Sequence, residues 1–297
     1  MHEMKRKKKS SMVLALIASM TATIAAAGCG DGGAQVSEND GGIDARTDAR
    51  SRITSPDVSA TEVEQLVEGC TTFGIELFQQ LRTDEKNLFL SPLSISLAMA
   101  MAYAGARTTT ESEIEAVMHF DLGQQRLHPA FNYLEMELSS RGADAQGTDE
   151  HPFRLHLINS YWAQIGYQFL SDFLDTLAFH YGVEMFLVDF HNQLEQARTA
   201  INQWVEAQTD GKIVELIQEG KLSAMTKLVL VNAIYFNAAW KNQFNDAYTT
   251  ERPFNLLGGQ QVTVPFMHRT GYLTYPQSNG WQVIELPSHR DHLTMVF

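Results

Sequence analysis

Cysteine is scarce in this sequence, and the familiar catalytic signatures are missing. Only Cys29 and Cys70 occur among 297 residues, so a framework of disulfides is excluded. Cys70 falls among apolar residues at helical spacing, which favours a small buried side chain over a redox role. The sequence contains no G-x-S-x-G, H-E-x-x-H, C-x-x-C or G-x-x-x-x-G-K-[ST] pattern. We therefore predict no catalytic residues, and the protein is not expected to be an enzyme.

Positive charge is also in short supply. The formal net charge is −13, and the basic run at residues 5–9 leaves the rest of the chain more acidic still. An acidic surface repels phosphate backbones and gains nothing from counterion release, so nucleic acid is not an expected partner. Gly28, Gly30 and Gly33 fit G-x-G-x-x-G, but no strand precedes them and no helix follows, so no nucleotide or other cofactor is predicted.

No stretch has the length of a typical membrane-spanning helix. Residues 12–27, apolar or small and preceded by the basic run, are too few to span a bilayer and instead resemble an export signal. The ending Ala26-Ala27-Gly28-Cys29 resembles a bacterial lipoprotein box, which implies lipidation of Cys29 and a membrane partner through the lipid anchor. The alternative is an ordinary signal peptide cut near Ala27. Either way the protein is expected to be exported, in the lipid-anchored case to the cell envelope or the extracellular side.

Three segments follow from this pattern. Residues 1–29 are predicted to be a lipoprotein-type signal peptide. Residues 30–55 are rich in Gly, Asp and Ser and lack aromatic residues, so they cannot bury enough surface to fold and are expected to be a flexible tether. Residues 56–297 are expected to form one large folded domain.

Helical patterns dominate the first half of this domain and strand patterns the last part, so the expected class is α+β. Ser91 is a plausible N-cap and Pro92 suits the first helical position. Thr110 and Glu113 have the spacing of a capping box. The expected helices cover 61–81, 92–105, 110–118, 127–139, 171–182 and 194–210. The expected strands cover 154–166, 183–190, 226–240, 251–254, 261–268, 281–286 and 291–297.

The strand expected at 226–240 is apolar on both faces and long. It therefore indicates a covered central strand in a large sheet. A single polar residue, Asn232, interrupts it. Because a buried polar side chain must find a hydrogen-bond partner, we expect Asn232 to be bonded to a neighbouring element.

Candidate ligands for a metal are weak. His289 and His292 lie near Asp291, but this spacing beside a turn is common by chance, and no metal site is predicted. Ser91 has no evident base partner and is better explained as a helix cap. Trp240 is a large apolar group with one donor, so core packing is its default role.

Four ordered motifs resemble the serpin family, over about residues 61–297. They are NLFLSPLSI at 87–95, GARTTT at 105–110, INQWV through TDGKI at 201–213, and LVNAIYF with WKNQF at 230–244. The resemblance implies a helical cluster around three β-sheets. It also implies suicide inhibition of serine or cysteine proteases: an exposed reactive loop is cut as bait, inserts into the main sheet as an extra strand, and distorts the bound protease.

Carried over to this sequence, the resemblance assigns roles to four residues. Ser91, Ser94 and Asn232 would lie in the region where the sheet opens, and Trp240 would lie at the top, where the loop enters. The reactive bond would follow Phe297, so it is unknown here.

In the family, the other wall of the gap, the hinge and the reactive loop follow the region that Phe297 reaches. We therefore expect a serpin domain that is incomplete at its C-terminus, and an inactive chain. The segment 128–141 has Glu135 and Glu137 with Arg141 as its basic residue, so no heparin-type activator is expected. The protein is expected to be a monomer. The alternative function is a non-inhibitory serpin-like surface lipoprotein with a binding or structural role.

Overall fold

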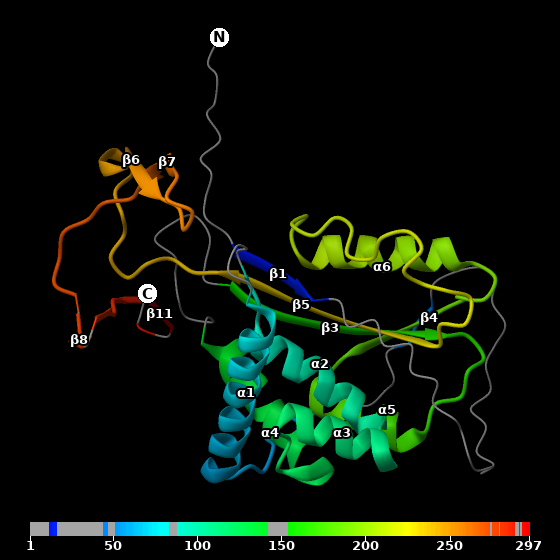
Figure 1. Ribbon diagram of the computed structural model, residues 1–297. Helices are drawn as coiled ribbons and strands as arrows, with labels where there is room; N and C mark the ends of the chain where they lie inside the picture. The colour runs from blue at the N-terminus through cyan, green and yellow to red at the C-terminus, as the bar shows by residue number, and fades with distance from the viewer. Residues whose placement is uncertain are drawn as a thin grey trace.

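The computed structural model describes residues 12–16, 44–46, 51–82, 88–141, 154–273, 275–278, 280–288, 291 and 293–297. Their centre is a five-stranded sheet with the strand order β1-β5-β3-β4-β2. Helices α1 to α5 pack against one face of this sheet, and helix α6 lies across the other (Figure 1). The strands are β1 (Met12–Leu16), β2 (Asp44–Arg46), β3 (Arg154–Gln164), β4 (Glu184–Val188) and β5 (Leu228–Asn237).

The helices fall where the apolar periodicity predicts them, with small shifts at their ends. They are α1 (Ala60–Leu81), α2 (Pro92–Gly105), α3 (Thr108–Met118), α4 (Gly123–Ser140), α5 (Ser171–Tyr181) and α6 (Leu194–Gln208). The capping box predicted from Thr110 and Glu113 is wrong. Helix α3 begins at Thr108 after Arg107, which makes no side-chain cap, because the chain turns there with a positive φ of 58° at Thr108.

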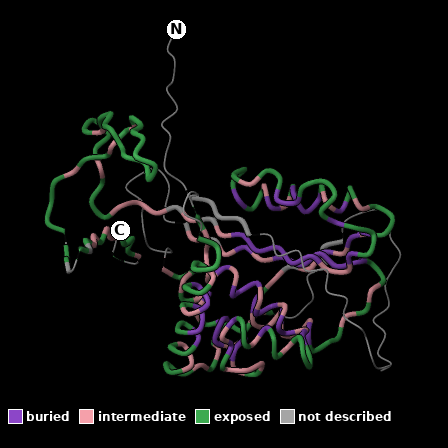
Figure 2. Tube along the Cα trace, viewed as in Figure 1, coloured by how far each residue is buried: buried purple, intermediate pink, exposed green. Residues whose placement is uncertain are grey.

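Two apolar cores lie on opposite faces of the sheet, and β5 contributes to both. Leu230 belongs to the core under helices α1 to α5, which also holds Cys70, buried as expected. Val229 and Val231 point the other way, into a core with Trp162 and Ile201 of α6. Alternating side chains of one strand therefore face two hydrophobic layers, and Figure 2 shows the resulting buried band along the sheet.

The predicted length of the central strand needs correction. Strand β5 ends at Asn237 instead of Trp240, and Trp240 makes only an isolated bridge to Ser288. At this end of the ladder, Asn237 pairs with Arg154 of β3 and Phe236 pairs with Met12 of β1.

The C-terminal strands form three small two-stranded sheets beside the main one. The hairpin predicted around Gly258-Gly259 is confirmed as β6 (Thr250–Asn255) and β7 (Gln261–Phe266), which follow a short 3-10 helix (Asp246–Tyr248). The hairpin predicted from 281–286 and 291–297 is only partly right. Its pairing is limited to β10 (Glu285–Pro287) with β11 (Thr294–Val296), whereas β9 (Trp281–Gln282) pairs with β8 (Gln277–Ser278).

The N-terminal part of the chain is described in pieces. Of the first 29 residues, 12–16 are described, as β1, so Cys29 lies outside the described residues, as do His289 and His292. The domain was expected to start at Pro56, but backbone contacts with the helices begin earlier. The Ile53 amide donates a hydrogen bond to the Phe179 carbonyl of α5 over 2.9 Å. Within the described ranges, no helix is long and apolar enough to cross a membrane.

Candidate functional site

The side chain of Asn232 ties three elements together at the middle of the main sheet. Its Oδ1 accepts a hydrogen bond from Ser94 Oγ of α2. Its Nδ2 donates to Asn159 Oδ1 of β3 over 2.7 Å. Asn232 is 2 % exposed and Ser94 1 %, so water does not compete for the bond between them, whereas the bond to Asn159 is part-buried. We call Ser94, Asn159 and Asn232 the polar lock.

The local sequence explains why these side chains meet. Ser91 accepts a hydrogen bond from the Ser94 amide over 3.3 Å and caps α2, and Pro92 occupies the first turn. The helix is apolar around its circumference, which buries it against the sheet and turns Ser94 toward β5. In the strand ladder, Asn159 stands directly opposite Asn232. Ser91 itself caps the helix, as expected, and contacts the Ser94 backbone amide, not the side-chain bonds of the lock.

Strand β5, which carries Asn232, lies between two neighbouring strands, β1 and β3. On one side it pairs with β3 over its whole length. On the other side β1 pairs antiparallel with it, in a register that sets Leu16 opposite Asn232. Along the edge of β5 that faces away from β3, the described pairs with β1 therefore run from Phe236 to Asn232 of the polar lock.

Trp240 lies apart from the lock, beyond the end of β5. Its ring meets Phe244 edge to face with centroids 6.3 Å apart, and the Arg269 guanidinium lies 5.5 Å from the centroid of Phe244. Lys241 donates its amide to the Pro287 carbonyl over 3.0 Å and pairs through its side chain with Asp291. The region at the end of β5 is thus a half-buried aromatic cluster held by the last strands.

The lock suits exchange of hydrogen bonds rather than bond-making chemistry. Its three members are neutral amides and a hydroxyl, without a base to activate Ser94. In the described part of the chain no group of three His, Cys, Asp or Glu side chains could hold a metal ion. The polar lock is therefore a set of side-chain hydrogen bonds that can break and re-form when the neighbouring strands of the sheet move.

The structure brings together two of the four residues assigned from sequence and adds a third. Ser94 and Asn232 are bonded, Ser91 supports the helix start, and Trp240 is distant. Asn159 was missed as a site residue. The sequence does mark Asn159 as a polar residue between Leu157 and Tyr161 in a strand pattern. Only the register of β3 and β5 shows that it faces Asn232.

Comparison with known proteins gives one consistent family. A family model described as "Serpin (serine protease inhibitor)" matches residues 68–297. The human leukocyte elastase inhibitor is 38% identical over 238 residues, which is 79% of this chain and 60% of the relative. A serpin-like protein of Thermococcus kodakarensis is 35% identical over 231 residues, or 78% of this chain and 52% of that protein. The chain thus spans about 60% of the length of the elastase inhibitors that it matches.

Solved structures agree with the family match. Emu (Dromaius novaehollandiae) ovalbumin superposes with a TM-score of 0.71 and 28% identity, over 78% of this chain and 62% of that one. Arabidopsis AtSerpin1 in its native stressed conformation gives 0.63 and 26%, over 77% and 56%. The expected α+β serpin fold is therefore confirmed. The family is one of protease inhibitors and not of enzymes, in line with the sequence.

Proposed function

This chain belongs to the serpin family, and on that premise we propose that the protein is an inhibitor of serine proteases that works by strand insertion beside β5. The observation that carries the proposal is the antiparallel pairing of an extra strand, β1, on the edge of β5 opposite β3. A cleaved reactive loop would occupy the same edge, and main-chain hydrogen bonds to β5 would drive its insertion.

The roles of individual residues follow from this proposal. The polar lock holds α2, β3 and β5 together while the sheet is closed, and its bonds are exchanged as the inserted strand passes Asn232. Trp240 and its aromatic neighbours lie where the loop begins its entry. The partners of the protein are serine or cysteine proteases, it acts as a monomer, and it needs no cofactor.

Incubation with a panel of serine proteases tests the proposed activity. A form of the protein that carries a reactive loop is expected to give a 1:1 complex that survives SDS, because the acyl bond is trapped when the loop inserts. The 297 residues alone are expected to give none. The proposal would be abandoned if the loop-bearing form were cleaved as an ordinary substrate by every protease in the panel.

We also propose that the protein is exported and anchored through a lipid on Cys29. The support is the sequence of the basic run, the apolar stretch and Ala26-Ala27-Gly28-Cys29. A mature chain that begins at Cys29 would lack β1, which would leave the edge of β5 open to another strand. If the insertion mechanism fails its test, the same anchor supports a non-inhibitory surface lipoprotein with a binding or structural role.

Replacing Cys29 by serine is expected to move the protein from the detergent-rich phase to the aqueous phase in a Triton X-114 partition of expressing bacteria. The wild-type chain should partition with detergent and carry the added mass of the lipid. Cys70→Ser serves as the matched control and should leave the partition unchanged, because that thiol is buried in the helical core. An aqueous wild-type protein would contradict lipidation and favour the ordinary signal peptide.

A further inference from the structure

The segment before α1 is fastened to two helices, through Arg52 to α4 and through Ile53 to α5. The Arg52 Nε donates to Asn132 Oδ1 of α4 over 2.8 Å, and its Nη2 lies 2.9 Å from Glu135 Oε2, one turn further on. Asn132 returns a bond from Nδ2 to the Ile53 carbonyl over 2.8 Å. Ile53 in turn donates its amide to Phe179 of α5 over 2.9 Å. The segment thus crosses the seam between α4 and α5 and is bonded to both.

The end of α5 is shaped to receive this arginine. Gly182 caps the helix with a positive φ of 57°, and a Cβ there would lie 2.8 Å from Arg52 Cδ. A side chain at this position would push the arginine away from the seam. On the other side, Glu135 is only 6% exposed in its side chain, so its charge is buried and depends on Arg52 for a partner.

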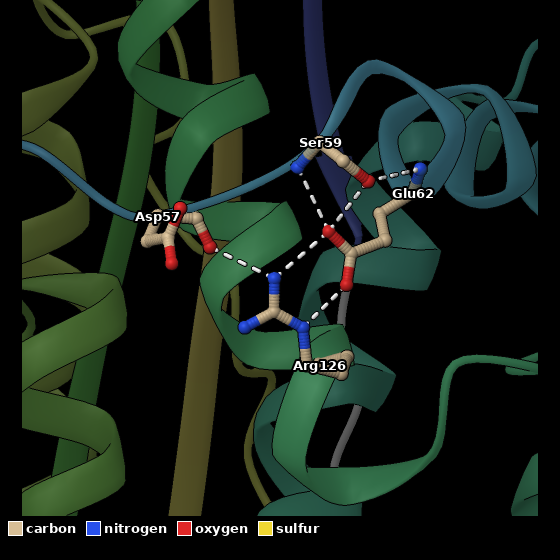
Figure 3. A network of polar contacts seen from close by, with 4 residues as sticks. All are labelled: Asp57, Ser59, Glu62 and Arg126. Atoms are coloured by element: carbon tan, nitrogen blue, oxygen red, sulfur yellow. Dashed lines mark hydrogen bonds and ion pairs between the residues drawn. The ribbon is translucent and has the colours of Figure 1, made fainter.

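A second attachment lies a few residues further along, at the start of α1. Figure 3 shows Arg126 of α4 donating to the Asp57 carbonyl, over 2.9 Å, and pairing with Glu62. Glu62 also accepts from the Ser59 amide over 2.8 Å in a capping box. These bonds hold the pKa of Glu62 at about 2, because the Arg126 hydrogen bond and those of Ser59 favour the carboxylate.

The surroundings of Arg52 differ from those of Arg126. They contain a carboxyl group and two imidazoles, which can each gain a proton in acid. Glu135 faces Arg52 and the Tyr181 hydroxyl. His180 of α5 faces Arg52 and stacks on His128 of α4 with ring centroids 6.3 Å apart. His128 bonds through Nδ1 to Tyr181 Oη at 2.6 Å, and Arg107 is the remaining cation near it.

We propose that residues 51–57 form a strap that closes the seam between α4 and α5 at neutral pH, and that mild acid releases its Arg52 end while its Asp57 end stays attached. The strap is the element that gives way because it is a single extended segment. Its loss breaks only a few bonds, whereas moving a histidine out of the seam would unfold a helix.

The direction of the response follows from the charges. At neutral pH the seam holds Arg52 and Glu135 as a balanced pair beside neutral imidazoles. Burial raises the pKa of Glu135 and lowers the pKa of His180. In acid Glu135 becomes neutral and His180 becomes a cation next to Arg52. Both changes weaken the electrostatic attraction between Arg52 and the seam. Glu62 remains ionised over the same range, so its ion pair with Arg126 persists.

Release would have two consequences for the protein. It would uncover the seam between α4 and α5 around Gly182. It would also loosen the connection between β2, which pairs with β4 in the main sheet, and the start of α1. Neither consequence depends on the inhibitory mechanism proposed above.

Hydrogen–deuterium exchange of the full chain tests the strap. We expect the protection of the Ile53 amide, relative to its intrinsic exchange rate at each pH, to fall at least tenfold between pH 7 and pH 4.5. Amides in the middle of α1 and α4 should stay protected over the same range. Unchanged protection of Ile53 would overturn the proposal, and so would a loss that occurs together with the loss in α1 and α4.

Three variants separate the strap from general stability. Arg52→Gln is expected to leave Ile53 unprotected at every pH, and Glu135→Gln should reduce its protection at pH 7 and flatten the pH response. Glu137→Gln is the matched control, because Glu137 is on the same helix but pairs with Arg141 at the surface, and it should behave as wild type. Wild-type protection of Ile53 in Arg52→Gln would also overturn the proposal.

Discussion

Replacing Asn232 by alanine is expected to lower the free energy of unfolding by about 3 kcal/mol. The substitution leaves the Ser94 hydroxyl without its acceptor and Asn159 Oδ1 without its donor. Ser94 is 1% exposed, so water cannot replace the lost acceptor, and each buried group left without a partner costs roughly 1–3 kcal/mol. Urea unfolding followed by circular dichroism measures the loss.

A matched control and a double-mutant cycle make this result specific. Asn255→Ala removes an asparagine of β6 whose side chain accepts a hydrogen bond from Gln261 at the surface, and its cost should stay within about 0.5 kcal/mol. Ser94→Ala and Asn232→Ala together should cost less than the sum of the two single substitutions, because they remove both partners of one bond. Additive losses would show that Ser94 and Asn232 are not coupled.

The same substitution bears on the proposed mechanism. If the polar lock holds the sheet closed, a weaker lock should ease the entry of an added strand. We therefore expect the loop-bearing form with Asn232→Ala to convert more readily into a state that no longer inhibits. That effect on activity can be separated from the loss of stability by comparison with a core variant of similar cost, such as Ile201→Ala, which is expected to cost about 2–5 kcal/mol.

Acidification is expected to destabilise the protein through His128. Its pKa is lowered to about 3, first by burial and then by His180 and Arg107. In the unfolded chain the imidazole has its ordinary pKa. Below that pKa the unfolded chain therefore binds a proton at His128 that the folded chain does not bind until the pH approaches 3. The stabilising effect is complete above about pH 6.5 and is lost as the pH falls toward 3, at about 1.4 kcal/mol per unit, or roughly 3 kcal/mol by pH 4.

Urea unfolding at a series of pH values measures this slope, and His128→Gln should reduce it by about one proton. Glutamine can still reach a hydroxyl or an amide, so part of the bonding to Tyr181 survives. His119→Gln serves as the surface comparison, because it also replaces an imidazole by an amide but at a residue that contacts Glu76 outside the core. Between pH 6.5 and 5 the carboxylate of Glu62 does not contribute, because its pKa is about 2. An unchanged slope in His128→Gln would contradict the assignment.

The helices, the buried polar residue of the central strand and the family could be predicted from the sequence, because the patterns that indicate them involve residues close together in the chain. The apolar periodicity places the helices α1 to α6 of the described residues, since the burial of one helical face depends on neighbours three and four residues apart. Asn232 was recognisable as a polar residue inside an apolar strand, and the serpin motifs indicated the family. These features depend on residues that are close together in the chain.

The tertiary structure decided which distant residues meet. Asn159 becomes a partner of Asn232 only through the register of β3 and β5. Trp240 lies beyond the end of β5 and bridges to Ser288 instead. Arg52, in a segment expected to be a tether, is held by Asn132 and Glu135, which lie far along the chain. Local sequence fixes which residues must be buried or bonded, but the choice of partner depends on how the elements pack.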